Sequence, residues 1–211
     1  MNKKGRLIVC SGPSGVGKGT IVRRYVEEHP GVELSVSATT RGPRPGEEEG
    51  VHYYFISREQ FEEKIAGDGM LEYASFAGNY YGTPRDKVEQ ALSRGRDVIL
   101  EIEVQGAMKV KARCPEALLV FIMPPSFEVL RRRLSGRGTE DAATVARRLS
   151  AAAGEMEKAR GYDYIVVNDD LEEALADFGA VITAAKCSIH DMKYLIDEVQ
   201  KDAQTCNDAN S

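Results

Sequence analysis

The sequence predicts an α/β fold in which a parallel sheet is covered by helices on both faces. Short apolar runs alternate along the chain with segments whose apolar residues recur at helical spacing. Strands buried on both faces have this continuous apolar character, and the helices between them form the crossovers of a parallel sheet. A glycine-rich turn joins the first apolar run to the first helix, and the 211 residues suffice for one domain with small insertions.

Local signals predict the elements of this sheet in order. Residues 6–10 form the first strand, and residues 18–29 carry the first helical stripe. Thr83 precedes Pro84 as a capping residue precedes a proline at the first helical position, which predicts a helix that ends near Gly95. The later elements are strand 97–103, helix 105–113, strand 117–123, a helix from Ser126 to Ser135, strand 164–167 and a helix capped by residues 168–170.

Two stretches break the alternation and are interpreted as insertions. Residues 35–83 hold turn residues, tyrosines and one short helix with a capping box formed by Ser57 and Gln60. Residues 136–148 begin with a glycine-flanked segment, and several arginines lie in and beside them. The core domain then consists of the remaining segments, residues 1–34, 84–135 and 149–211.

Composition excludes several classes of protein. The chain has 28 Lys and Arg against 33 Asp and Glu, a net charge of −5, which argues against a protein that coats nucleic acid by bulk charge. The longest apolar run, residues 117–123, is shorter than the ~20 residues of a membrane-spanning helix. The four cysteines show neither zinc nor disulfide spacing. We expect a cytoplasmic protein that has neither nucleic acid nor a membrane as its partner.

Residues 12–20 fit the phosphate-loop pattern G-x-x-x-x-G-K and lie between a predicted strand and a predicted helix. Glycines in such a loop let backbone N–H groups line an anion nest, and the following helix adds its positive end. Lys18 supplies a mobile charge for the β- and γ-phosphates. The loop predicts a nucleoside triphosphate site formed by Ser14, Gly15, Val16, Gly17, Lys18, Gly19 and Thr20.

One position departs from this pattern. Gly19 stands where a serine or threonine usually follows the lysine, and Thr20 comes one place later. We therefore expect Mg²⁺ to be held mainly through water and phosphate, with Thr20 helping at a phosphate.

The first insertion carries groups suited to a second phosphate. Arg41 and Arg44 flank Pro43, and the stiffened loop lowers the cost of fixing two guanidinium groups that can bind phosphate bidentately. Tyr53 and Tyr81 offer hydroxyl donors to the same anion. An isolated arginine or tyrosine would be interpreted as a surface or core residue, but the whole set beside a phosphate loop favours a binding site.

Two acidic residues lie at the end of a predicted strand. Glu101 and Glu103 alternate with apolar residues, so both are expected to point to one side. They lie at the carboxyl end of the strand, where open parallel sheets bind ligands. Which of the two contacts a nucleotide and which orders a magnesium-bound water stays open.

These motifs together resemble guanylate kinase, the nucleoside monophosphate kinase that acts on GMP. The resemblance rests on residues 35–44, 78–83, 136–140 and 167–169, in the order in which that family has them. It implies a P-loop NTPase-type parallel sheet flanked by helices, in which residues 35–83 are a small mixed α/β GMP-binding insertion and residues 136–148 a short helical lid.

The resemblance also implies a role for each candidate residue. Glu72 would read guanine, because a carboxylate accepts the adjacent N1–H and N2–H₂ groups, whereas adenine presents an acceptor at N1. The residues expected to bind GMP are Ser37, Arg41, Arg44, Glu47, Tyr53, Glu72, Tyr81, Thr83, Glu101 and Glu103.

The same resemblance implies the catalytic set. Phosphoryl transfer needs alignment, exclusion of water and neutralisation of charge more than covalent help. Lys18, Arg44, Arg137 and Arg148 are the expected catalytic residues, with Arg137 and Asn168 also binding ATP. Thr20 and Glu101 are expected to serve the Mg²⁺ that accompanies ATP, through water.

We expect a reversible, Mg²⁺-dependent transfer from ATP to GMP that gives ADP and GDP in purine nucleotide metabolism and GTP supply, by a monomer or a small homo-oligomer. The alternatives are a non-catalytic guanylate-kinase-like module that binds protein partners, and a kinase for AMP or UMP. The intact phosphate loop with Lys18 argues against the first alternative, and Glu72 argues against the second.

The last predicted helix has an apolar stripe at helical spacing, formed by Met192, Leu195, Ile196 and Val199. Such a stripe is more often core packing than an interface, so we interpret it as part of the core.

Overall fold

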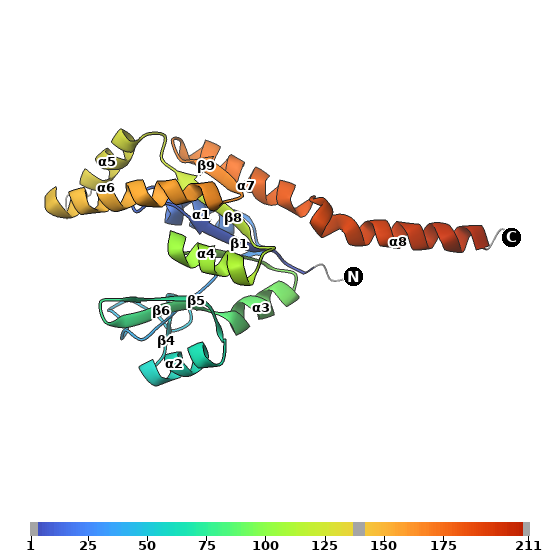
Figure 1. Cartoon of the computed structure of the whole chain (residues 1–211), viewed down its shortest axis with the longest axis horizontal. Coiled ribbons are helices and arrows are strands. Elements are labelled where there is room, and N and C mark those ends of the chain that lie inside the picture. The colour runs from blue at the N-terminus through green and yellow to red at the C-terminus, as the bar shows by residue number, and fades with distance from the viewer. Residues whose placement is uncertain (1–3, 137–141, 209–211) are drawn as a thin grey trace.

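A five-stranded parallel sheet forms the centre of the computed structural model, which describes residues 4–136 and 142–208 (Figure 1). Every pairing between neighbouring strands is parallel, which confirms the predicted α/β class. The strands lie in the order β2 (Val32–Leu34), β7 (Asp97–Glu101), β1 (Leu7–Ser11), β8 (Leu118–Met123) and β9 (Tyr164–Val167).

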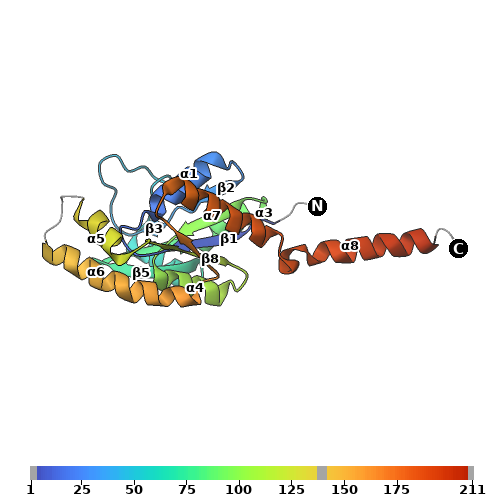
Figure 2. The same ribbon diagram turned by 90° about the horizontal axis from the view of Figure 1, so that it is seen from above.

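Helices cover both faces of this sheet, with α1 and α7 on one side and α4 on the other (Figure 2). The alternation of β1 shows the division, because Ile8 packs into one buried cluster and Val9 into the other. The first cluster includes residues of α1 (Lys18–Glu28), α5 (Phe127–Ser135), α6 (Ala142–Glu157) and α7 (Leu171–Lys186). The second includes residues of α3 (Arg85–Ser93) and α4 (Val104–Arg113).

A second, smaller sheet lies beside the first and is drawn below it in Figure 1. It is mixed, with β3 parallel to β4 and antiparallel to β6. The helix α2 (Arg58–Ala66) begins with the predicted capping box of Ser57 and Gln60 and packs Phe61 against this sheet. Its strands lie in the order β4 (Tyr54–Phe55), β3 (Ala38–Thr39), β6 (Asn79–Pro84) and β5 (Met70–Phe76).

Two sequence interpretations are wrong at the ends of elements. Thr83 does not cap α3, because Thr83 and Pro84 end strand β6 and the Thr83 hydroxyl donates to Glu72 instead. The strand predicted over residues 97–103 ends at Glu101, and Glu103 occupies the N-cap position of α4 without a capping hydrogen bond from its side chain. Pairing of β7 with β1 ends at Cys10 and Glu101, since the chain after β1 turns into the phosphate loop.

The C-terminal helix α8 (Ile189–Asp208) extends away from both sheets (Figures 1 and 2). Leu195, Ile196 and Val199 are 43%, 48% and 58% exposed, so the interpretation of this stripe as core packing is wrong. Helical periodicity shows that one face is apolar but does not identify what that face contacts. A short 3₁₀ turn, Lys158–Gly161, follows α6. Within the described ranges, no helix combines the length and apolar character that crossing a membrane requires.

Candidate active site

The phosphate loop, residues 12–20, is packed closely against neighbouring elements. Gly12 has φ +152°, and a Cβ there would lie 2.3 Å from the backbone oxygen of Ile122. Gly17 has φ +98°, and its Cβ would lie 2.5 Å from the Asn168 amide nitrogen. Only glycine fits both the conformations and the space. Because α1 begins at Lys18, within this segment, its positive end adds to the loop N–H groups, which suits a polyphosphate.

Lys18 folds back over the loop that precedes it. Its Nζ donates to the carbonyl oxygens of Gly12 at 2.6 Å and Pro13 at 3.2 Å. Both partners are neutral, so they orient the ammonium group without cancelling its charge. The arrangement leaves a positioned cation for the phosphates of a nucleotide.

Hydrogen bonds from Asn168 and Arg133 hold the phosphate loop at Val16. Asn168, after β9, donates from its side-chain amide to the backbone oxygen of Val16 at 2.7 Å. Arg133, on α5, donates to the backbone oxygens of Asn168 at 2.8 Å and Val16 at 3.4 Å. Val16 and Asn168 are both buried. Asn168 therefore holds the loop in place, and its predicted contact with adenine stays a prediction.

A cavity of about 420 Å³ lies between the end of β7, the start of α4 and the second sheet. Parallel strands bring their carboxyl ends to one edge, so the cavity and the phosphate loop occupy the same edge of the main sheet. The predicted residues that line it are Ser37, Tyr53, Glu72, Tyr81, Glu101 and Glu103.

Glu72 is the buried acid of this cavity. Its side chain is 8% exposed, and the Thr83 hydroxyl donates to its Oε1 at 2.8 Å. Burial raises the pKa of the Glu72 carboxyl, and the nearby Glu103 raises it further. The Thr83 hydrogen bonds and the charge of Lys109 partly oppose this increase. The two carboxylate oxygens of Glu72 are thus poorly solvated. Hydrogen bonds from a ligand to these oxygens would be stronger here than at the protein surface.

Arg41, in the first insertion, is held by a bidentate ion pair with Glu47. Its two terminal nitrogens each lie 2.9 Å from an oxygen of Glu47, and its guanidinium lies 5.4 Å from the centre of the Tyr53 ring. The hydrogen bond from Arg41, followed by that from the Arg44 backbone, lowers the pKa of Glu47 to about 2. The Tyr81 ring lies 6.1 Å from the Tyr53 ring, and Glu47 and, less strongly, Tyr81 raise the pKa of the Arg41 guanidinium. Three of the residues predicted for the GMP phosphate are therefore together, and Glu47 orients one of them.

Glu101 faces the position where the usual hydroxyl residue of the loop is missing. A Cβ built on Gly19 would lie 3.3 and 3.4 Å from the two Glu101 carboxylate oxygens. Mg²⁺ prefers oxygen ligands and is usually bound by one or two carboxylates together with water and substrate phosphates. Glu101 beside the phosphate loop fits such a site, although the described residues contain no cluster of three or more acidic, His or Cys ligands.

Helix α6 places two side chains, Arg148 and Glu155, beside the phosphate loop. Arg148 donates to the Ser14 hydroxyl, and Glu155 lies near enough to Ser14 for the Ser14 backbone N–H to lower the pKa of its carboxyl slightly. Burial, and the charge of Glu103, raise the pKa of Glu155, whereas Lys18 lowers it. Both side chains come from one face of α6, because residues seven apart are two turns apart.

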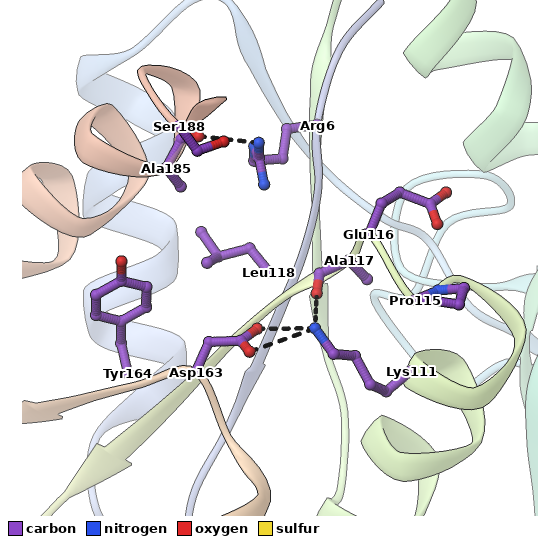
Figure 3. Close-up of a pocket in the computed structure, with 10 residues that line it drawn as sticks. All are labelled: Arg6, Lys111, Pro115, Glu116, Ala117, Leu118, Asp163, Tyr164, Ala185 and Ser188. Carbon is purple, nitrogen blue, oxygen red and sulfur yellow. Dashed lines mark hydrogen bonds and ion pairs between the residues drawn. The ribbon is translucent and has the colours of Figure 1, made fainter. Parts of the chain in front are cut away.

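A larger cavity of about 640 Å³ lies at the opposite, amino end of the strands (Figure 3). Both of its basic side chains, Lys111 and Arg6, already have partners. Lys111 donates to Asp163 at 3.0 Å and to the backbone of Ala117 at 2.8 Å, while Arg6 donates to the Ala185 backbone and pairs with Asp191. This internal neutralisation makes the cavity a weaker candidate for a phosphate than the edge with the loop.

The sequence and the fold match one family of proteins. The family model described as guanylate kinase matches residues 4–185. A guanylate kinase of Desulfitobacterium hafniense is 50% identical over 195 residues, which are 92% of this chain and 98% of the relative. One of Thermus thermophilus is 55% identical over 183 residues, 87% of this chain and 83% of the relative.

The chain belongs to the guanylate kinase family. The fold agrees, since a crystal structure of guanylate kinase from Anaplasma phagocytophilum matches with a TM-score of 0.69, 36% identity and coverage of 89% of each chain.

One residue predicted for this guanylate kinase site stands apart from the others, and a second lies outside the part of the chain that the structure describes. Arg44 is exposed. Its backbone N–H, rather than its guanidinium, donates to Glu47 at 2.8 Å. Arg137 lies outside the described residues. The roles proposed for the guanidinium groups of both residues stay predictions.

The sequence interpretation of the guanylate kinase site missed Glu155, Lys109 and Gly106. Glu155 lies near Ser14 and Lys18 of the phosphate loop, Lys109 lowers the pKa of Glu72, and Gly106 packs beside Glu72. The helical register of Arg148 and Glu155 on α6 could have indicated the first. Nothing local indicated the other two, because their importance comes from the packing of α4 against β5.

Proposed function

We propose that this chain transfers the γ-phosphoryl group of ATP reversibly to GMP, giving ADP and GDP. The observation that carries the proposal is the buried Glu72 with its Thr83 donor, in a cavity on the same sheet edge as the phosphate loop. A buried carboxylate is costly unless a ligand with donors pairs with it. Guanine supplies two adjacent donors.

Side chains on the second sheet and its loops would bind the phosphate of the acceptor nucleotide. Arg41, oriented by Glu47, and the hydroxyls of Tyr53 and Tyr81 would hold it, with Arg44 reaching it from the same loop. Guanine bound at Glu72 and phosphate bound at Arg41 fix the nucleotide at two points. Such fixing aligns the attacking oxygen with the donor phosphate.

The donor nucleotide is placed by the phosphate loop. The loop N–H groups and Lys18 would hold the β- and γ-phosphates, and Arg148 lies at Ser14 in the same loop. Positive groups around the transferred phosphoryl stabilise the charge that spreads over its oxygens in the transition state. We assign to Lys18, Arg44, Arg137 and Arg148 this electrostatic role.

We propose that Mg²⁺ bound with ATP neutralises phosphate charge in this reaction, with Glu101 and Thr20 as its protein contacts through water. We also propose that the reaction takes place in the cytoplasm as part of GTP supply, where ATP and GMP are both present. The chain would act there as a monomer or small homo-oligomer, with neither nucleic acid nor a membrane as a partner.

A coupled assay tests the proposal. The chain is mixed with Mg²⁺, ATP and one monophosphate at a time, GMP, AMP or UMP, and the release of ADP is followed. The proposal expects turnover with GMP and a kcat/KM for AMP lower by ~10⁴-fold, because adenine leaves the buried Glu72 facing a lone pair. No turnover with GMP would refute the activity, and equal turnover with AMP would refute the guanine readout.

A further inference from the structure

The first turn of α4 places Gly106 beside Glu72, the residue proposed to bind guanine. Gly106 is buried and lines the same cavity as Glu72. A Cβ built on Gly106 would lie 3.0 Å from Glu72 Oε2 and 3.4 Å from its carboxyl carbon. It would also lie 3.3 Å from Ile102 Cδ1. Oε2 therefore occupies the space that any other residue at this position would use.

Glu72 has little room to move away. Its Oε1 accepts the Thr83 hydroxyl at 2.8 Å, and both side chains are almost fully buried between β5 and β6. A shift that relieved a contact at Oε2 would lengthen or bend the bond at Oε1. Hydrogen bonds weaken steeply with such distortion.

The position of helix α4, which carries Gly106, is also fixed relative to β5. One turn further along α4, Lys109 donates from Nζ to the backbone oxygen of Tyr73 on β5 at 2.8 Å. This bond connects the helix to the strand that holds Glu72. The separation between Gly106 and the carboxylate is therefore set by the fold.

We propose that Gly106 is a specificity-determining residue, because its missing side chain lets both oxygens of Glu72 face the N1–H and N2–H₂ of guanine together. The inference deepens the proposed function and rests on it. Two adjacent donors need both carboxylate oxygens in place, whereas a single donor tolerates a displaced acceptor. A methyl group at position 106 would thus penalise guanine more than a base with one donor.

The variant Gly106→Ala tests this with the full chain. The dissociation constants of GMP and of inosine monophosphate, which keeps N1–H but lacks the 2-amino group, are measured by calorimetry, along with kcat/KM for GMP and KM for ATP. We expect GMP affinity to fall by ~10-fold or more, as for a charged hydrogen bond, and the preference for GMP over inosine monophosphate to shrink. KM for ATP should not change.

A matched control separates this effect from changes in folding. Gly154 also lies inside a helix, α6, and a Cβ there meets nothing within 4 Å. Alanine is favoured over glycine inside helices, so Gly154→Ala should melt no lower than the parent chain, whereas crowding at Glu72 offsets this gain in Gly106→Ala. Thermal melting of both variants checks that each is folded at the temperature of the binding measurement. Gly154→Ala should leave the affinity for GMP unchanged.

Two outcomes would overturn the inference. The first is an unchanged GMP affinity in Gly106→Ala, and the second is an equal loss for GMP and inosine monophosphate. Failure of the proposed function looks different, because the parent chain itself would then show no turnover with GMP.

Discussion

Glu72 places stability and function in conflict. Its pKa is raised in the folded chain, so the folded state binds this proton more tightly than the unfolded state does. The contribution of Glu72 to stability is then greatest below the ordinary glutamate pKa and is lost as the pH rises through the raised value. At neutral pH the buried carboxylate is a cost that the guanine site requires.

The variant Glu72→Gln should remove that cost. We expect the melting temperature at pH 7 to rise by about 2 °C, while kcat/KM for GMP falls by ~10²-fold or more. The amide keeps the size of the side chain but cannot accept two donors with two oxygens. Thermal unfolding and the coupled assay measure the two effects. A lower melting temperature with GMP turnover retained would contradict both expectations.

The pH dependence of GMP use reports the same carboxyl. Glu72 must be ionised to accept from guanine, so kcat/KM for GMP should decline as the pH falls through its raised pKa, above the range of an ordinary glutamate. Lys109 lowers that pKa by its charge. In Lys109→Met the acid limb should therefore move to higher pH, and in Lys109→Arg it should stay near that of the parent. A limb that is the same in all three proteins would exclude Glu72 as its source.

Two further variants separate the donor and acceptor sites. Lys18→Ala should reduce kcat by ~10²-fold or more, because it removes charge from the transferred phosphoryl group. Arg44→Ala should chiefly raise KM for GMP, because the arginine is proposed to bind the acceptor phosphate. Steady-state kinetics with each substrate varied in turn measure both. If both variants keep the parent kcat/KM, the proposed map of the site is wrong.

Among the elements, helix starts with local side-chain signals could be predicted from the sequence. Ser126 accepts from the Val129 N–H, and Asp170 accepts from the N–H groups of Glu172 and Glu173, as their sequence positions predict. Thr83 has the same local signal, yet its hydroxyl donates to Glu72 and its backbone belongs to β6. A cap depends on three residues of sequence, whereas the partner of Thr83 lies on another strand.

The C-terminal helix gives a prediction at this scale. Its start is tied to the body by the ion pair of Asp191 with Arg6, but beyond it the apolar side chains Leu195, Ile196 and Val199 are exposed. Removing residues 194–211 should therefore leave kcat and both KM values unchanged and shift the melting temperature by less than about 2 °C. Circular dichroism melting and the coupled assay measure this. A large loss of stability would show that this helix packs against the protein in solution.

For the whole molecule, the contacts that assemble the site connect distant parts of the chain. Arg148 reaches Ser14 across 134 residues, and Asn168 reaches Val16 across 152. Motifs in the sequence predicted most of these residues one by one. Their pairing, and the role of Gly106, could not be predicted because they depend on how α6 and α4 pack against the sheet.

The net charge of −5 describes the molecule as a whole and not its binding edge. Lys18 and Arg148 lie at the phosphate loop, and Arg41 lies among the tyrosines of the second sheet. The negative average excludes a broad basic surface but is compatible with a few positioned cations. Such focused charge suits two small phosphorylated ligands.

A crystal structure of the chain with GMP and a non-hydrolysable ATP analogue would show whether both nucleotides bind as proposed. We expect guanine N1 and N2 within hydrogen-bond distance of the two Glu72 oxygens and the GMP phosphate at Arg41, Tyr53 and Tyr81. We also expect the analogue's β- and γ-phosphates at the loop and Lys18, with the γ-phosphate directed at the GMP phosphate. Guanine bound away from Glu72, or an analogue bound away from the loop, would contradict the proposed binding.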